Sequence, residues 1–175
     1  MKLYPTLRHR HLIFAGMLFL AFAFGTISRL FFGNPLQAQT NAPAPPPPGA
    51  TVEKDKDTGK PIITTPSGLK YEDLVVGTGP GAKTGDHLVV NYEGRLLDGT
   101  KFDSSYDRNQ PFDVVLGVTQ VIPGWTEGLA NMKAGSTRKL IIPPQLAYGL
   151  NGAGDVIPPN ATLIFKVEVI AINPK

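Results

Sequence analysis

The chain has 175 residues, a formal net charge of +3 and no cysteine. The basic excess lies in residues 1–65, where seven Lys/Arg and three Asp/Glu give a net charge of +4. Residues 66–175 carry ten Lys/Arg and eleven Asp/Glu, which give a net charge of −1. No basic patch therefore favours nucleic-acid binding, and disulfides, thiolate nucleophiles and cysteine-based metal sites are excluded. His87 is the only histidine after residue 11, so a histidine-dependent hydrolase would have to use it, and we expect neither a metal nor a cofactor.

Residues 1–38 have the pattern of an export signal. Basic residues precede an uncharged run from Leu12 to Ile27, whose length lies between that of a signal-peptide core and that of a membrane span. Two outcomes stay open, namely cleavage near Ala38 and retention of residues 12–32 as a membrane anchor. Both place the rest of the chain in an extracytoplasmic compartment, such as a periplasm or a thylakoid lumen.

Residues 39–65 have the composition of a disordered linker. Five of the six residues 43–48 are proline, which favours a stiff polyproline II spacer of about 3.1 Å per residue. Residues 53–60 are charged and show no apolar periodicity. A ligand for a proline-binding domain is the alternative interpretation of the proline run.

From residue 66 the pattern changes to short strands. An apolar strand is predicted over 69–76, and alternation over 87–93 predicts a half-buried strand. Asp98-Gly99 then marks a hairpin turn that precedes Phe102, and a further strand is predicted over 112–116.

The second half of this region adds the only helix. The helix is predicted to begin at Pro123, run through Leu129 and Met132, and stop at Gly135. Strands are predicted over 140–142 and 162–172, separated by a Gly/Pro-rich loop over 145–159. The predicted class is α+β, with an antiparallel sheet packed against one short helix.

The aromatic residues are the candidate functional groups. Trp125 opens the predicted helix, and one aromatic taken alone is better explained by a core position than by a binding site. Tyr148 carries a stronger signal because it lies in a loop, where an aromatic is either anchored or exposed for binding. Asp103 fits a turn carboxylate, Asp107 and Arg108 are predicted to form a local ion pair, and His87 is predicted to face solvent.

Several motifs occur in a familiar order. The chain resembles the FKBP-type peptidyl-prolyl isomerases over residues 66–173, through Val90–Gly94, Gly99–Ser105, Pro111-Phe112, Val121–Trp125, Glu127–Leu129, Ala147–Gly149 and Ile157–Leu163. The resemblance implies a five- to six-stranded antiparallel half-barrel wrapped around the helix, with a shallow hydrophobic pocket between them.

The resemblance also implies site residues and a function. Trp125 would form the floor of a proline pocket, with walls from Tyr92, Phe112, Val121 and Phe165. The catalytic set would be Phe102, Asp103, Ile122 and Tyr148, with Ile122 acting through its backbone N–H. The expected partners are proline-containing peptides, folding proteins and macrolide inhibitors, and the chain is expected to be a monomer. The expected function is acceleration of X–Pro rotation during folding of extracytoplasmic proteins, and a binding module or chaperone with little turnover is the alternative.

Overall fold

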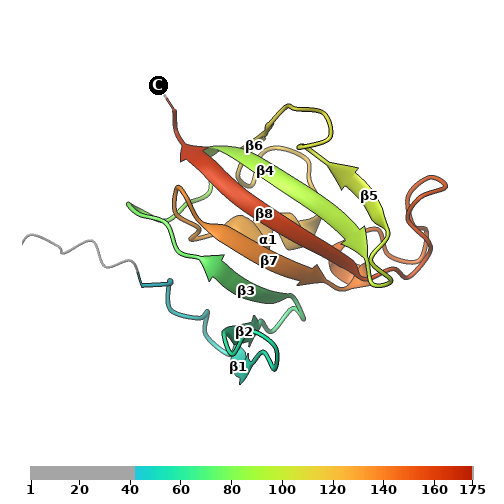
Figure 1. Cartoon of the computed structure of the whole chain (residues 1–175), viewed down its shortest axis with the longest axis horizontal. Coiled ribbons are helices and arrows are strands. Elements are labelled where there is room, and N and C mark those ends of the chain that lie inside the picture. The colour runs from blue at the N-terminus through green and yellow to red at the C-terminus, as the bar shows by residue number, and fades with distance from the viewer. Residues whose placement is uncertain (1–41, 175) are drawn as a thin grey trace, which may run out of the picture. The chain divides into compact units, whose positions relative to one another are not determined.

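The structure, a computed structural model, describes residues 42–174 (Figure 1). The predicted export segment 1–38, including the candidate anchor 12–32, lies outside these residues. Among the helices of residues 42–174, none is both long enough and apolar enough to cross a membrane.

Within residues 42–174, eight strands form one antiparallel sheet. Its order is β1-β2-β3-β7-β8-β4-β5, and β6 pairs with the same strand, β4, that carries β5 (Figure 1). The strands are β1 (Thr51–Lys54), β2 (Pro61–Thr64), β3 (Lys70–Val75), β4 (His87–Leu96), β5 (Lys101–Ser104), β6 (Phe112–Val115), β7 (Thr137–Ile142) and β8 (Leu163–Ile172).

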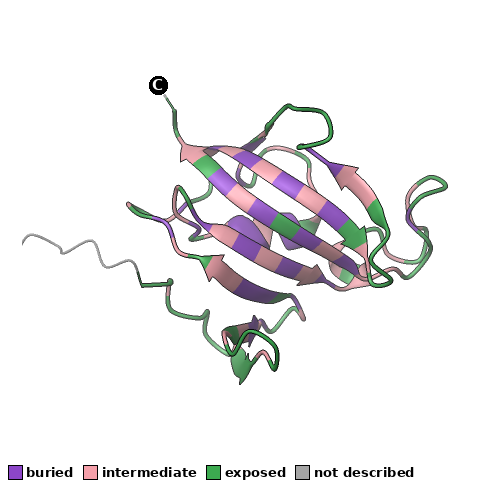
Figure 2. Ribbon diagram, viewed as in Figure 1, coloured by how far each residue is buried: buried purple, intermediate pink, exposed green. Residues whose placement is uncertain are grey.

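The core lies between the inner face of the sheet and the helix α1 (Pro123–Leu129). Buried residues alternate with more exposed ones along β4 and β8 (Figure 2), as expected for strands with one covered face. The inward positions are those that the alternation predicts: Leu88, Val90, Tyr92, Leu163, Phe165, Val167 and Val169 are all buried. The predicted antiparallel sheet against a single short helix is confirmed.

Two glycines allow α1 to lie close to β7. A Cβ atom at Gly124 would stand 2.4 Å from a side-chain carbon of Ile142, and one at Gly128 would stand 2.7 Å from Leu140. Because residues four apart share one face of a helix, both glycines face the sheet. This close approach brings the neighbouring Trp125 into the core, where it is buried.

The helix is shorter than the sequence predicts. It ends at Leu129, and Asn131 adopts a left-handed φ of 63°, so the chain leaves the helix before Met132. Met132 is nevertheless buried. The spacing of Leu129 and Met132 that predicted a longer helix therefore reflects the packing of the turn that follows α1. A 3₁₀ turn at Pro144–Leu146 overlaps the start of the loop predicted over 145–159.

The predicted disordered linker needs a correction over its last part. Residues 51–64, assigned to the linker over 39–65, form β1 and β2, and β2 pairs with β3. Ile63 of β2 is buried in the core, and the Lys60 Nζ donates to the Leu74 carbonyl at 2.6 Å. With these two strands, the sheet has more strands than the predicted five to six. The sequence of this hairpin is mostly polar, but one buried isoleucine and local hydrogen bonds are enough to hold it against the sheet.

Deletion of residues 1–65 is expected to destabilise the domain by roughly 3–6 kcal/mol. The deletion exposes the apolar surface covered by Ile63, worth about 1.5–3 kcal/mol. It also removes the hydrogen bond of 2.7 Å from Thr58 to the buried carboxylate of Glu72, worth about 1.5–3 kcal/mol for a charged partner. Urea unfolding gives the measurement, and deletion of residues 1–49, which retains the hairpin, is the control. Equal stability of the two truncated chains would contradict a structural role for β1 and β2.

Candidate functional site

A cavity of about 220 Å³ opens between α1, the sheet and two connecting segments, residues 120–122 and the loop that carries Tyr148. The structure brings all nine predicted site residues together around it, and it adds one residue, Gln120, that the sequence did not indicate. The lining residues are Tyr92, Phe102, Asp103, Phe112, Gln120, Val121, Ile122, Trp125, Tyr148 and Phe165. His87 is not among them; it lies at the surface with its Nε2 2.6 Å from Asp113.

The floor of the cavity is an edge-to-face aromatic cluster. The Trp125 ring centroid lies 5.0 Å from that of Tyr92, 5.3 Å from that of Phe165 and 6.1 Å from that of Phe112, with interplanar angles of 86°, 85° and 74°. Edge-to-face pairs at such distances are favourable beyond the area they bury. The Trp125 indole is therefore held by rings on several sides, which fixes the orientation of the face that lines the cavity.

Gly94 allows two walls of the cavity to meet. A Cβ atom at this position of β4 would lie 2.7 Å from the Phe102 ring and 2.8 Å from the Phe165 ring. These two rings pack edge to face across Gly94 with centroids 5.5 Å apart. A larger residue in this strand would displace at least one of them.

The rim of the cavity begins where β4 changes its partner strand on one edge. His87–Val90 pair with β6, whereas Glu93–Arg95 pair with β5. Between them the Tyr92 N–H donates to the buried Ser105 Oγ at 2.9 Å. Ser105 thus replaces one rung of the ladder, and residues 105–111 leave the sheet as a loop beside the cavity.

This loop delivers Arg108 to the rim. Arg108 donates from Nη1 to Asp103 Oδ1 and from Nη2 to the Tyr92 hydroxyl at 2.7 Å, while that hydroxyl donates to Asp103 Oδ2 at 2.5 Å. The predicted pair of Asp107 with Arg108 is wrong, because Asp107 pairs with Lys101 at 2.5 Å. The two adjacent side chains take different partners on the two sides of the loop.

Asp103 is ionised at neutral pH. Partial burial opposes its ionisation, but hydrogen bonds from Tyr92 and Arg108 outweigh burial and lower the pKa of the Asp103 carboxyl. Burial, followed by the hydrogen bond to Asp103, raises the pKa of the Tyr92 hydroxyl, which therefore remains a donor. An ionised carboxylate engaged by two donors is suited to electrostatic support of the rim and poorly suited to donate a proton.

The Asp103→Asn substitution is expected to change the pH dependence of stability. Because folding lowers the pKa of Asp103, its ionised form stabilises the fold above the unfolded pKa of about 3.9, and this contribution is lost as the pH falls through the folded pKa. The difference in free energy of unfolding between the two chains should be constant above about pH 5 and shrink below about pH 4. It should not exceed about 1 kcal/mol, because the carboxylate is 40% exposed and solvent screens it.

Urea unfolding at a series of pH values measures that difference. The Asp107→Asn substitution on the same loop serves as the control for loss of a surface ion pair. A difference for Asp103→Asn that persisted undiminished at about pH 2.5, well below the ordinary pKa of Asp, would contradict the assignment.

Several hydrogen-bond donors of the cavity have no partner within residues 42–174, and the buried Trp125 Nε1 is one of them. The Ile122 N–H donates to no group of the described chain, although the Ile122 carbonyl accepts from Trp125 at 2.9 Å. The Tyr148 hydroxyl is also without a partner in this part of the chain, and the side chain is 42% exposed. Pro123 has no N–H, so the backbone N–H that directly precedes it is that of Ile122. The cavity therefore combines an aromatic floor with two donors able to bind a carbonyl oxygen.

The sequence did not indicate two residues of the cavity, Arg108 on its rim and Gln120 in its lining. Arg108 lies five positions after Asp103, and only the turn between them brings their side chains together. Gln120 directly precedes the Val121–Trp125 motif in the segment that leads into α1. Its place next to this motif was the only indication in the sequence that it could line the cavity.

Comparison with known proteins identifies the family. The sequence model described as FKBP-type peptidyl-prolyl cis-trans isomerase matches residues 79–170. The FK506-binding protein of Neisseria meningitidis serogroup B is 55% identical over 105 residues, which cover 60% of this chain and 96% of that protein. FK506-binding protein 4 of Dictyostelium discoideum is 52% identical over 122 residues, 70% of this chain and 33% of that protein.

The solved structures agree with the fold. The crystal structure of FkpA from Escherichia coli aligns with a TM-score of 0.61 and 48% identity over 68% of this chain and 54% of that chain. The chain thus spans about a third of the Dictyostelium protein and about half of FkpA, but nearly all of the Neisseria protein. With more than half of its residues matched by the family model and nearly all of a close relative covered, the chain belongs to the FKBP-type peptidyl-prolyl cis-trans isomerases.

Proposed function

We propose that this chain accelerates rotation about X–Pro peptide bonds in proteins that fold outside the cytoplasm, and that the nine residues predicted from the sequence form its active site. The observation that carries the proposal is the 220 Å³ cavity with Trp125 at its floor and free donors at Ile122 and Tyr148. This volume is below the roughly 300–1,000 Å³ of typical small-molecule sites. It suits one proline ring better than an extended ligand.

The chemistry fits a site without nucleophile or cofactor. Rotation about an X–Pro amide has a barrier of about 18–20 kcal/mol and takes tens to hundreds of seconds unassisted. An acceleration of about 10⁴-fold needs only about 5–6 kcal/mol of transition-state stabilisation. No covalent bond is made or broken, so binding the twisted amide better than the planar amide is sufficient.

The cavity supplies that difference in three ways. The twisted amide is less dipolar than the planar one, so an aromatic surface with little water stabilises it relative to the hydrated ground state. Phe102, Tyr92 and Trp125 would hold the proline ring. The Ile122 N–H and the Tyr148 O–H would bind substrate carbonyls and fix the chain on either side of the rotating bond.

The charged rim has a supporting role in this mechanism. Asp103, held by Tyr92 and Arg108, would orient polar groups of the substrate and hold the Tyr92 ring against the floor. Proton transfer is not required of it, which agrees with the lowered pKa of its carboxyl.

The export-type N-terminus supports an extracytoplasmic location, either after cleavage near Ala38 or with residues 12–32 as an anchor. The proposed substrates are proline-containing segments of folding proteins, and macrolides are the proposed inhibitors because the family includes FK506-binding proteins. We expect the chain to act as a monomer, since one copy holds every residue of the cavity.

A protease-coupled assay on a proline tetrapeptide tests the activity. We expect acceleration by the wild-type chain and a loss of about 5- to 15-fold in kcat/KM for Tyr148→Phe, since removing one hydrogen bond costs roughly 1–1.5 kcal/mol. Tyr106→Phe is the matched control, because the Tyr106 hydroxyl bonds Glu168 away from the cavity. Peptide binding without acceleration would favour the binding-module alternative and overturn the proposed enzyme.

A further inference from the structure

Residues 42–49 lie along the surface of the domain, and we call them the proline strap. Near its start, Lys133 donates from Nζ to the Ala42 carbonyl at 3.1 Å. At its end, a turn at residues 48–49 leads toward β1, and the Ala50 N–H donates to the Pro47 carbonyl at 3.1 Å. Figure 1 shows the strap running below β3 toward β1. The strap is therefore held to the domain near both of its ends.

The strap lies over two hollows of the surface. A groove of about 380 Å³ separates it from the β1–β2 hairpin, and a pocket of about 170 Å³ separates it from the last turn of α1. We call these the hairpin groove and the helix-end pocket. Pro43, Ala44 and Pro46 line the groove, whereas Ala44, Pro45 and Pro47 line the pocket. Positions three apart thus face the same hollow, which agrees with the three residues per turn of polyproline II.

The hairpin groove is apolar. Apart from the strap, its lining consists of Val52, Lys60, Pro61, Ile63, Asp73, Leu74 and Val76. The Lys60 Nζ donates to the Leu74 carbonyl at 2.6 Å, and Asp73 accepts from Arg138 at 2.7 Å, so both charged groups are already engaged. Every lining residue precedes residue 79, where the match to the family model begins. The groove therefore suits uncharged side chains such as proline and lies outside the matched region.

The helix-end pocket adds unused hydrogen-bond donors. The Tyr71 hydroxyl and the Asn131 side-chain amide belong to residues of its lining, and neither has a hydrogen-bond partner within residues 42–174. Burial raises the pKa of the Tyr71 hydroxyl, which therefore remains a donor. A proline-rich segment has few N–H groups, and its backbone carbonyls are free to accept. An aromatic residue beside carbonyl-binding donors is suited to recognise such a segment.

Few contacts hold the strap itself. Ala44 is its one partly buried residue, and the other seven residues of 42–49 are exposed. The strap therefore covers the two hollows without filling them. Because polyproline II is also a preferred conformation of free proline-rich chains, such a segment loses little conformational entropy when it binds. Another segment of the same kind can thus compete with the strap for this surface.

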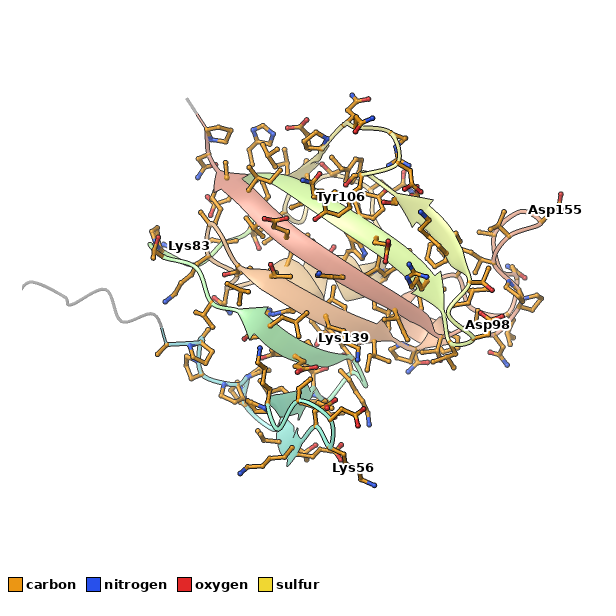
Figure 3. The ribbon with its side chains drawn as sticks, in the orientation of Figure 1. Lys56, Lys83, Asp98, Tyr106, Lys139 and Asp155 are labelled. Carbon is orange, nitrogen blue, oxygen red and sulfur yellow. The ribbon has the colours of Figure 1, made fainter. Side chains whose placement is uncertain are left out.

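We propose that the hairpin groove and the helix-end pocket together form a binding site for proline-rich segments. The strap occupies this site within the chain, and a proline-rich segment of another protein binds when it takes the place of the strap. Within residues 42–174, no residue lines both this site and the cavity. Figure 3 shows Lys56, in the turn of the β1–β2 hairpin, far from Asp155, which follows the cavity residue Tyr148 along the chain. A partner can therefore be bound while the cavity is free.

Polarisation of a fluorescent octaproline peptide tests the site in the full chain. A strap variant combines Pro43→Gly, Pro45→Gly, Pro46→Gly and Pro47→Gly, which remove the polyproline II preference of the strap and leave the domain surface in place. We expect the strap variant to bind octaproline about five- to tenfold more tightly than wild type. This gain corresponds to a wild-type site that its own strap leaves free in only about 10–20% of molecules.

Two further substitutions in the strap variant test the donors. Tyr71→Phe keeps the aromatic ring, and Asn131→Gly suits the left-handed φ of 63° at that position. Together they should weaken octaproline binding by about five- to thirtyfold, because two hydrogen bonds are lost. Tyr106→Phe is the matched control, since its hydroxyl bonds Glu168, and it should leave the affinity unchanged. Urea unfolding checks that each variant is folded.

The Asn131 side-chain NH₂ signals in NMR spectra give a measurement that needs no substitution within the site. They should shift when octaproline is added to the strap variant. Equal affinity of wild type and strap variant, or no loss of affinity with Tyr71→Phe and Asn131→Gly, would overturn the inference. Complete displacement of octaproline by a proline tetrapeptide would also overturn it, because the peptide would then lie in the cavity. These measurements report binding alone, so they decide the question whether or not the chain shows isomerase activity.

Discussion

Replacement of Trp125 by alanine is expected to lower the free energy of unfolding by about 3–5 kcal/mol, as for other buried aromatic residues. It is also expected to lower kcat/KM for a proline tetrapeptide by about 10- to 150-fold in molecules that remain folded. The first effect follows from burial of the indole among Tyr92, Phe112 and Phe165. The second follows because a bound proline ring would lose its floor, a contact worth roughly 1.5–3 kcal/mol.

Stability and activity must be separated in this experiment. Met132→Ala is the control, since Met132 is equally buried beyond the other end of α1 and its loss should cost about 2–5 kcal/mol without touching the cavity. Trp125→Phe should fall between wild type and Trp125→Ala in both measurements, because it retains an aromatic surface of smaller area. Wild-type kcat/KM in folded Trp125→Ala, measured at a temperature where urea unfolding shows the native state, would contradict the assignment of the floor.

The lining of the cavity could be predicted from the sequence because its residues lie on regular elements or in short motifs. Alternation on β4 fixes that Tyr92 faces inward, and the start of the helix at Pro123 fixes that Trp125 enters the core in its first turn. Phe165 follows from the same alternation on β8. In each case one local rule determines the direction of the side chain, and the order of the motifs places the elements beside one another.

The features that the sequence did not reveal depend on contacts between distant or irregular segments. Arg108 and Asp107 are neighbours of opposite charge, but the turn sends one to Asp103 and the other to Lys101. The hairpin at 51–64 was missed because its sequence is mostly polar, and in the structure Ile63 is its only buried apolar residue. A strand that covers only the edge of a sheet needs little apolar alternation, so its composition resembles that of a linker.

The stability of the fold also depends on an arginine that no motif indicates. Arg138 on β7 is 5% exposed and donates from Nε to Asp73 Oδ1 at 2.7 Å and from Nη1 to the Gly128 carbonyl at 2.8 Å. Its guanidinium also lies 4.3 Å from the centroid of the Tyr71 ring. One side chain thus links β3, β7 and the last turn of α1.

Arg138→Ala is therefore expected to destabilise the fold by about 3–5 kcal/mol, as for removal of one partner from a buried ion pair. Asp73 is left without its charge partner, and the carbonyls at the end of α1 lose their donor, which costs further free energy. Asp73→Ala should also be costly. The double variant should cost less than the sum of the two single variants, because the first substitution already removes the interaction that the second would break.

A double-mutant cycle by urea unfolding measures this coupling, and Arg138→Lys is the conservative control that keeps the charge but loses the bidentate geometry. A cost below about 1 kcal/mol for Arg138→Ala, the value typical of surface pairs, would contradict the role assigned to Arg138. The seven-residue helix α1 is too short to be stable alone, so its two ends depend on different contacts: the Trp125 ring cluster at the first and Arg138 at the last. Folded Arg138→Ala should therefore retain a kcat/KM close to wild type, because the end of the helix that lines the cavity keeps its own contacts.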